Sequence, residues 1–140
     1  MEQENMKGNI MNRKIPMFIG VIGAIVVSFA ITLLSKAHAR DILVVLVGYF
    51  GGVYLGVGLL TASLKKAALQ DGASAVFFVL ALAGLWVNPL FLALACFVHA
   101  VWDIIIEHPK TLNTSVAFWY VPTCVAFDIL LGVFILVWWR

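Results

Sequence analysis

The chain has 140 residues, of which 64% are hydrophobic and 11% are charged, whereas soluble domains are about half apolar and about a quarter charged. This composition excludes a water-soluble globular domain. The formal net charge of +2, with no dense basic cluster, argues against a nucleic-acid partner. Because a spanning helix takes about 20 residues, the predicted fold is all-α: an integral membrane bundle of about five transmembrane helices, with the lipid bilayer as its main partner.

The first 14 residues are polar and lack periodicity, so we expect residues 1–14 to form a frayed cytoplasmic tail. The remaining residues, 15–140, are expected to form a single transmembrane bundle. The first apolar run extends from Ile15 to about Leu34 and predicts a spanning helix. Pro16 would then lie in its first turn, where the missing N–H of proline has no cost.

A secretory signal is the alternative interpretation of this first segment. Arg13-Lys14, the apolar run and Ala37-His38-Ala39 follow the order of a basic region, an apolar core and a cleavage site with small residues. The run of about 20 residues is longer than the usual core of 7–15 residues. An uncleaved span is therefore favoured, and cleavage would leave four spans.

The second apolar run, from about Ile42 to Leu64, carries glycines at a regular spacing. Gly48, Gly52 and Gly56 recur every four residues and fall on one helical stripe, where a neighbouring backbone can approach closely. Such a stripe serves homo-oligomers and packing within one chain alike. Both uses are open from the sequence.

The long apolar stretch over residues 73–106 is interrupted by Asn88-Pro89. Proline disfavours helix at the preceding residue, and Asn-Pro favours a turn. We therefore predict a third span over about 68–87 and a fourth over about 90–106. One long helix kinked at the proline is the competing interpretation, since such helices occur in membranes.

The last span is predicted to begin between Thr114 and Tyr120 and to end at Arg140. With five spans the loops alternate between the two sides, and positive residues concentrate on the cytoplasmic side. This rule predicts a multi-pass protein of the cell membrane with its N-terminus in the cytoplasm and its C-terminus outside. The predicted cytoplasmic side has the larger set of cations, namely Lys7, Arg13, Lys14, Lys65, Lys66 and Lys110. The other side has Lys36, Arg40 and Arg140.

Three ionisable residues fall inside the last two predicted spans: His99, Asp103 and Asp128. A central Asp costs about 2.5–3.5 kcal/mol on insertion scales, so such residues usually have a function. His99 and Asp103 are four residues apart and lie on one helix face. At 1.5 Å per residue, His99 and Asp128 would lie roughly 10 and 12 Å deep from the same side. The three side chains are therefore predicted to meet.

Three interpretations of this cluster are open. The first is structural, with a protonated Asp and a neutral His joined across the bundle. The second is a catalytic or binding site, in which His99 acts as acid or base, Asp103 orients it, and Asp128 stays protonated or binds a cation. The third is a divalent transition metal held by His99, Asp103, Asp128 and either Glu107 or His108, since imidazole with carboxylates suits Zn, Mn or Fe.

Several short motifs resemble those of one group of small bacterial membrane proteins. They are His99-Ala-Val-Trp-Asp103, His108-Pro109, Val121-Pro122-Thr123 with the downstream Asp128, and the glycine-rich run Gly48 to Gly58. The chain is similar to this uncharacterised family, a domain of unknown function with H-x-x-W-D and V-P-[ST] motifs. The resemblance implies a multi-span membrane fold and implies no activity.

Three functions are consistent with this pattern. The first is a small membrane protein whose cytoplasm-facing polar pocket binds or converts a small or lipidic ligand. The second is a non-catalytic module that oligomerises through its glycine stripe, and the third is a small transporter subunit. The sequence does not distinguish an enzyme from a binding protein.

Overall fold

The computed structural model describes residues 2–107 and 116–140, with side chains from residue 13 onward. It is all-helical in these residues, as predicted. The five helices are α1 (Glu2–Thr32), α2 (Lys36–Leu59), α3 (Leu64–Trp86), α4 (Leu90–Glu107) and α5 (Tyr120–Trp138). Each contains a stretch long and apolar enough to cross a membrane. The chain is a small integral membrane protein of five candidate spans.

The outer surface of the bundle is apolar. Phe18 is 64% exposed, Val45 72% and Trp86 74%. Buried positions, by contrast, include the polar residues Gln70, Ser74, His99, Asp103 and Asp128. Large contiguous apolar surfaces are rare on soluble monomers, so this distribution fits a bundle whose solvent is lipid.

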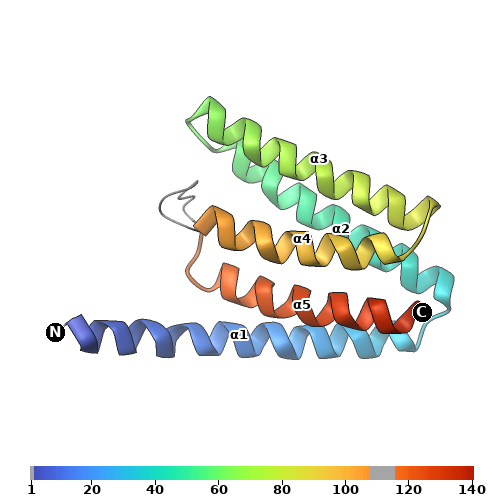
Figure 1. The fold of residues 1–140 in the computed structure, drawn as a ribbon, viewed down its shortest axis with the longest axis horizontal. Helices are drawn as coiled ribbons and strands as arrows, with labels where there is room; N and C mark the ends of the chain where they lie inside the picture. The colour runs from blue at the N-terminus through green and yellow to red at the C-terminus, as the bar shows by residue number, and fades with distance from the viewer. Residues whose placement is uncertain (1, 108–115) are drawn as a thin grey trace.

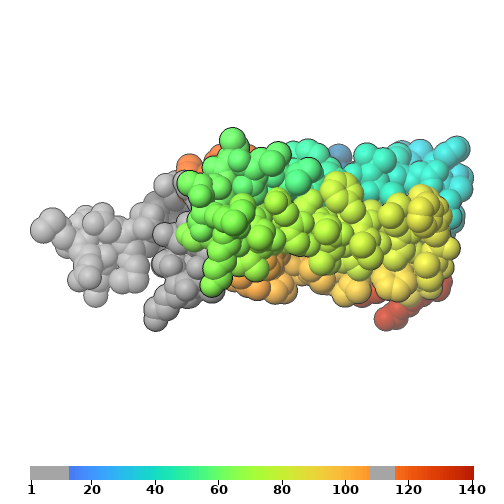
Figure 2. All heavy atoms as spheres, turned by 90° about the horizontal axis from the view of Figure 1, so that it is seen from above, coloured from blue at the N-terminus to red at the C-terminus, as the bar shows by residue number. Residues whose placement is uncertain are grey.

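The helices lie side by side along one long axis, and consecutive helices run in opposite directions (Figure 1). Helix α5 packs between α1 and α4, whereas α3 packs against both α2 and α4. Figure 2 shows the face formed by α2 and α3, with α4 along its edge. The N- and C-termini lie at opposite ends of the bundle (Figure 1). This is the arrangement that an odd number of spans requires.

Helix α1 begins well before the predicted span. The tail predicted over residues 1–14 is not frayed in residues 2–14, which belong to α1, and the candidate membrane span found in the described part of this helix is Arg13–Thr32. Pro16 consequently lies inside the helix and not in its first turn. The hydroxyl of Thr123 on α5 lies 2.7 Å from the carbonyl oxygen of Trp119 and 3.1 Å from that of Pro16, so its one hydrogen is shared between them or serves one of them, and the hydroxyl contacts α1 beside the proline.

Helices α2 and α3 both begin earlier than hydropathy predicts. Helix α2 starts at Lys36, where the Ser35 hydroxyl accepts the backbone N–H of His38 at 3.3 Å and caps the helix. It ends at Leu59, and α3 starts at Leu64. The predicted bounds followed the apolar residues, whereas the starts of both helices extend into polar residues at the bundle ends. The predicted end of the second span at Leu64 is wrong, because α2 already ends at Leu59 and Leu64 is the first residue of α3.

The break at Asn88-Pro89 is confirmed. Helix α3 ends at Trp86, and α4 begins at Leu90. The Asn88 side-chain oxygen accepts the backbone N–H of Leu90 at 2.9 Å, so the asparagine caps the turn that proline begins. The alternative of one long kinked helix is therefore wrong.

The glycines of α2 divide between two faces. A Cβ added at Gly51 would lie 3.1 Å from the carbonyl oxygen of Ser74, and one at Gly58 would overlap the Asp71 carboxylate, so both glycines face α3. A Cβ added at Gly52 or Gly56 would meet nothing within 4 Å. The close packing within the chain thus uses the glycines beside the predicted stripe, and much of the stripe itself is open.

Candidate functional site

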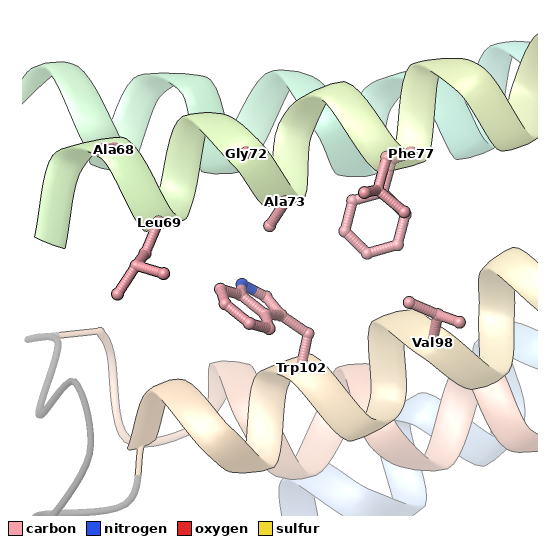
Figure 3. A pocket seen from close by; sticks show the side chains of 8 residues that line it. Ala68, Leu69, Gly72, Ala73, Phe77, Val98 and Trp102 are labelled. Atoms are coloured by element: carbon pink, nitrogen blue, oxygen red, sulfur yellow. The ribbon is translucent and has the colours of Figure 1, made fainter. Parts of the chain in front are cut away.

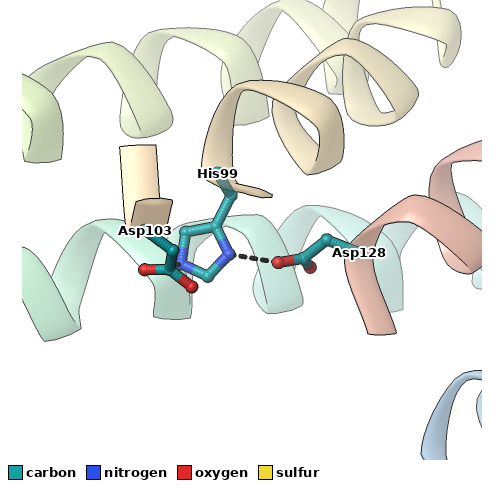
Figure 4. Close-up of side chains that lie close together, drawn as sticks. All are labelled: His99, Asp103 and Asp128. Atoms are coloured by element: carbon teal, nitrogen blue, oxygen red, sulfur yellow. Dashed lines mark hydrogen bonds and ion pairs between the residues drawn. The ribbon is translucent and has the colours of Figure 1, made fainter. Parts of the chain in front are cut away.

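His99, Asp103 and Asp128 meet in the interior of the bundle, as predicted. Their exposed fractions are 1%, 0% and 0%. His99 and Asp103 are one turn apart on α4, and Asp128 faces them from α5 (Figure 4). The two carboxyl groups lie on either side of the imidazole ring, so each ring nitrogen has an acidic neighbour.

The hydrogen bond to the imidazole comes from α5. His99 Nδ1 is 2.5 Å from Asp128 Oδ2, whereas His99 Nε2 is 4.0 Å from Asp103 Oδ1, which is too long for a hydrogen bond. The residue placed to orient the ring is therefore Asp128, in place of the predicted Asp103. The helical i, i+4 spacing holds Asp103 near the ring but not against it.

Tyr54 on α2 is a fourth member of the site and was not predicted. Its hydroxyl donates a hydrogen bond to Asp103 Oδ1, and Tyr54 is fully buried. Tyrosine is common at membrane interfaces, so its presence in an apolar run gives no sign of an interior role. The contact depends on the packing of α2 against α4, which the sequence does not reveal.

Aromatic rings enclose the imidazole. Phe50 stacks on His99 with ring centroids 4.1 Å apart and an interplanar angle of 5°. Phe77 and Tyr54 approach the ring from other directions, each with its centroid at 5.4 Å. These rings fix the orientation of the imidazole and keep lipid and bulk water away from it.

Three polar atoms of the site have no hydrogen-bond partner. Among the described side chains, four buried nitrogen or oxygen atoms lack one, and three of them are His99 Nε2, Asp103 Oδ2 and Asp128 Oδ1. Each such atom costs about 1–3 kcal/mol in an apolar interior. Their concentration at one place makes this cluster the candidate functional site.

The same residues could hold a metal ion. One ligand atom from each of His99, Asp103 and Asp128 lies within 4.8 Å of the others, and imidazole with carboxylates is a donor set for Zn, Mn or Fe. With a neutral imidazole whose proton is on Nδ1, the three unpartnered atoms would supply lone pairs for such an ion. His108, one of the predicted additional ligands, lies outside the described residues.

A comparison with known protein families identifies the family of this chain. A model described as a family of unknown function, DUF6010, matches residues 15–139. The chain belongs to DUF6010. No curated protein and no solved structure matches it. The resemblance to an uncharacterised family is thereby confirmed, and the matched segment includes every residue of the buried site.

Glu107 does not belong to the candidate metal site of this DUF6010 protein. Its carboxylate accepts from Arg13 at 2.7 Å, and the two side chains are 30% and 55% exposed. Arg13 lies on α1, so the ion pair joins two helices at the end of the bundle. The prediction of Glu107 as a metal ligand is not supported by this position.

The substitution Glu107→Gln is therefore expected to have a small effect. Exposed ion pairs contribute about 0–1 kcal/mol, so the free energy of unfolding should fall by less than about 1 kcal/mol. Unfolding by SDS in mixed micelles measures this change. The metal content of the purified variant should equal that of the wild type, and a loss of metal would restore Glu107 as a ligand.

A hollow of about 200 Å³ leads towards the site of the DUF6010 protein from the end where α5 begins. Tyr54 and Tyr120 contribute its polar groups, and the other lining residues are apolar: Val53, Val57, Ile106, Val116 and Ala117. Tyr54 both lines this hollow and bonds to Asp103, so it connects the hollow to the buried carboxylate.

Proposed function

We propose that the His99 cluster of this membrane protein is an acid–base site that binds, and exchanges a proton with, a small or lipidic ligand. The observation that supports this most directly is the set of three buried, unpartnered polar atoms on His99, Asp103 and Asp128. A purely structural cluster gains most when every polar group is satisfied. A ligand site leaves groups free for the ligand.

The arrangement supports a different role for each side chain. Asp128 holds Nδ1 of His99 at 2.5 Å, which fixes the ring and leaves Nε2 as the atom that gives or takes a proton. Asp103 lies 4.0 Å from Nε2 and is held by Tyr54. A polar group of the ligand bound between Nε2 and the free Asp103 oxygen would contact both. Its route would be the hollow beside Tyr54 and Tyr120.

The test compares what the protein carries or changes in cells. Wild type, His99→Ala and Asp128→Asn would be produced at equal levels, with Asp41→Asn as an exposed control. Untargeted mass spectrometry is applied to membrane extracts and to the purified protein. It should find a small molecule or lipid whose amount changes when the wild type or the Asp41→Asn control is produced, relative to cells without the protein. That difference should vanish in both site variants. Identical extracts from all four proteins would refute the proposal.

A divalent transition metal at the site is a second candidate, because the three ligand atoms lie within 4.8 Å of one another. A bound metal would supply a Lewis acid beside the ligand. Elemental analysis of the same preparations tests it: about one metal per chain, lost in both site variants and retained in Asp41→Asn, supports the metal. No metal in the wild type excludes it.

We also propose that the protein lies in the cell membrane with its N-terminus in the cytoplasm, from the distribution of cations, and that it has no nucleic-acid partner. A module that oligomerises through Gly48, Gly52 and Gly56 is the alternative function, supported by the open space at Gly52 and Gly56. In that case Gly52→Leu, and not His99→Ala, would abolish the cellular effect and the oligomer.

A further inference from the structure

A second hollow, of about 290 Å³, lies between α3 and α4, away from the hollow at Tyr54. Figure 3 shows Trp102 projecting from α4 towards α3, with Val98 further along the same helix. Half of the wall formed by α3 consists of small residues, namely Ala68, Gly72 and Ala73, and the other half of Leu69, Val76 and Phe77, with Phe77 at the far end (Figure 3). We call this hollow the α3–α4 slot.

The α3–α4 slot accepts only an apolar occupant. Every lining side chain is a hydrocarbon except Trp102, and its indole N–H donates to the side-chain oxygen of buried Gln70 at 3.3 Å. A polar solute would lose its hydration in the slot without gaining hydrogen bonds. The bilayer outside supplies hydrocarbon chains, so a lipid chain is the species that fits.

The small residues of α3 keep the slot open. A Cβ added at Gly72 would meet nothing within 4 Å, and Gly72 is exposed. Leu69 stands at one end of the slot, Phe77 and Val98 at the other, and Trp102 lies between them opposite Ala73 (Figure 3). The long direction of the slot therefore follows the helices, which is also the general direction of lipid chains in a bilayer.

A positive charge lies one helical turn beyond the slot. Lys65 is exposed in the first turn of α3, three and four residues before the lining residues Ala68 and Leu69, so it is on the same helix face. Lys66 lies beside it. A chain in the slot would bring its headgroup to this end, where a lysine favours a headgroup with a net negative charge over a zwitterionic one.

We propose that the α3–α4 slot binds one chain of an anionic phospholipid, whose phosphate headgroup is held by Lys65. The slot shares Phe77 with the surroundings of His99, but this proposal does not rest on the function proposed for His99. A basic residue beside an anionic headgroup favours it by roughly fivefold, so anionic lipid should occupy the slot about five times more tightly than zwitterionic lipid.

Quenching of Trp102 fluorescence by brominated lipids tests the proposal. The intact protein is reconstituted in vesicles of phosphatidylcholine with a fixed fraction of either brominated phosphatidylglycerol or brominated phosphatidylcholine. The Trp102 signal is the difference between wild type and Trp102→Phe. Brominated phosphatidylglycerol should quench it at about one fifth of the concentration that the zwitterionic lipid requires.

Three variants separate the slot from the general lipid surface. Lys65→Gln should remove the preference for phosphatidylglycerol, and Gly72→Leu should reduce quenching by both lipids because leucine fills the slot. Ala75→Leu, at an exposed position of α3 outside the lining, should behave as wild type. Equal quenching by the two lipids in the wild type, or an unchanged preference in Lys65→Gln, would overturn the proposal.

Discussion

Replacing His99 by leucine is expected to lower the free energy of unfolding by about 3–5 kcal/mol. The imidazole is 1% exposed, and its Nδ1 lies 2.5 Å from Asp128 Oδ2. Without it, the Asp128 carboxyl group loses its hydrogen-bond partner in an apolar interior and finds no water to replace it. SDS-driven unfolding in mixed micelles measures the change.

A double-mutant cycle then shows whether the pair is ionic or neutral. His99→Leu, Asp128→Leu and the double variant give the coupling energy between the two side chains. Neutral polar pairs in membranes couple by about 0.6 kcal/mol and at most about 1.7. We expect about 2–3 kcal/mol, because an ion pair shielded from water couples more strongly.

The control for this cycle is the exposed pair Arg40 and Asp41, whose closest atoms are 3.3 Å apart. The cycle of Arg40→Leu and Asp41→Leu should give a coupling below about 1 kcal/mol. If His99 and Asp128 couple no more strongly than this control, the cluster is ordinary polar packing, and the acid–base proposal loses its basis.

The second large effect is expected at Gly20, where α1 contacts α5. A Cβ added there would overlap the backbone carbonyl of Thr123 and lie 3.2 Å from the Cβ of Ala126. Backbone atoms cannot rotate away, so Gly20→Leu must push the helices apart. Overpacking of this kind costs about 1–3 kcal/mol and occasionally more, and we expect the upper end, since the atom in the way is a backbone carbonyl oxygen of α5.

Ala30→Leu is the matched control, because Ala30 is exposed on the same helix. The free energy of unfolding of Ala30→Leu should remain within about 0.5 kcal/mol of the wild-type value. Gly20→Leu, by contrast, should unfold at a clearly lower concentration of SDS. Equal stability of the two variants would show that α1 does not pack on α5 through Gly20.

The helices were predictable because they depend on local properties. Hydropathy located the five spans, and Asn88-Pro89 correctly separated α3 from α4, since the turn is set by neighbouring residues. The start of α1 at Glu2 was missed because a helix in polar residues has no apolar signal. The start of α2 at Lys36 depends on the Ser35 cap, which lies outside the apolar run.

The part of the site that was predictable is the meeting of α4 and α5, two antiparallel helices that follow one another in the sequence. The i, i+4 spacing of His99 and Asp103 and the similar depth of Asp128 were sufficient to bring the three together. The imidazole of His99 forms its hydrogen bond with Asp128 and not with Asp103, and this choice depends on how α4 and α5 pack. Tyr54 contributes from α2, far away in the sequence, and nothing in its apolar surroundings distinguishes it.

The most direct test of the central claim is the ¹⁵N NMR spectrum of His99 in protein labelled on its histidines. The chain contains three histidines, and His99→Gln identifies the signals of this one. We predict that its Nδ1 signal shows a strong hydrogen bond and shifts in Asp128→Asn, while the signals of the other two stay unchanged. A His99 spectrum that matches the other two histidines and does not respond to Asp128→Asn would contradict the buried pair.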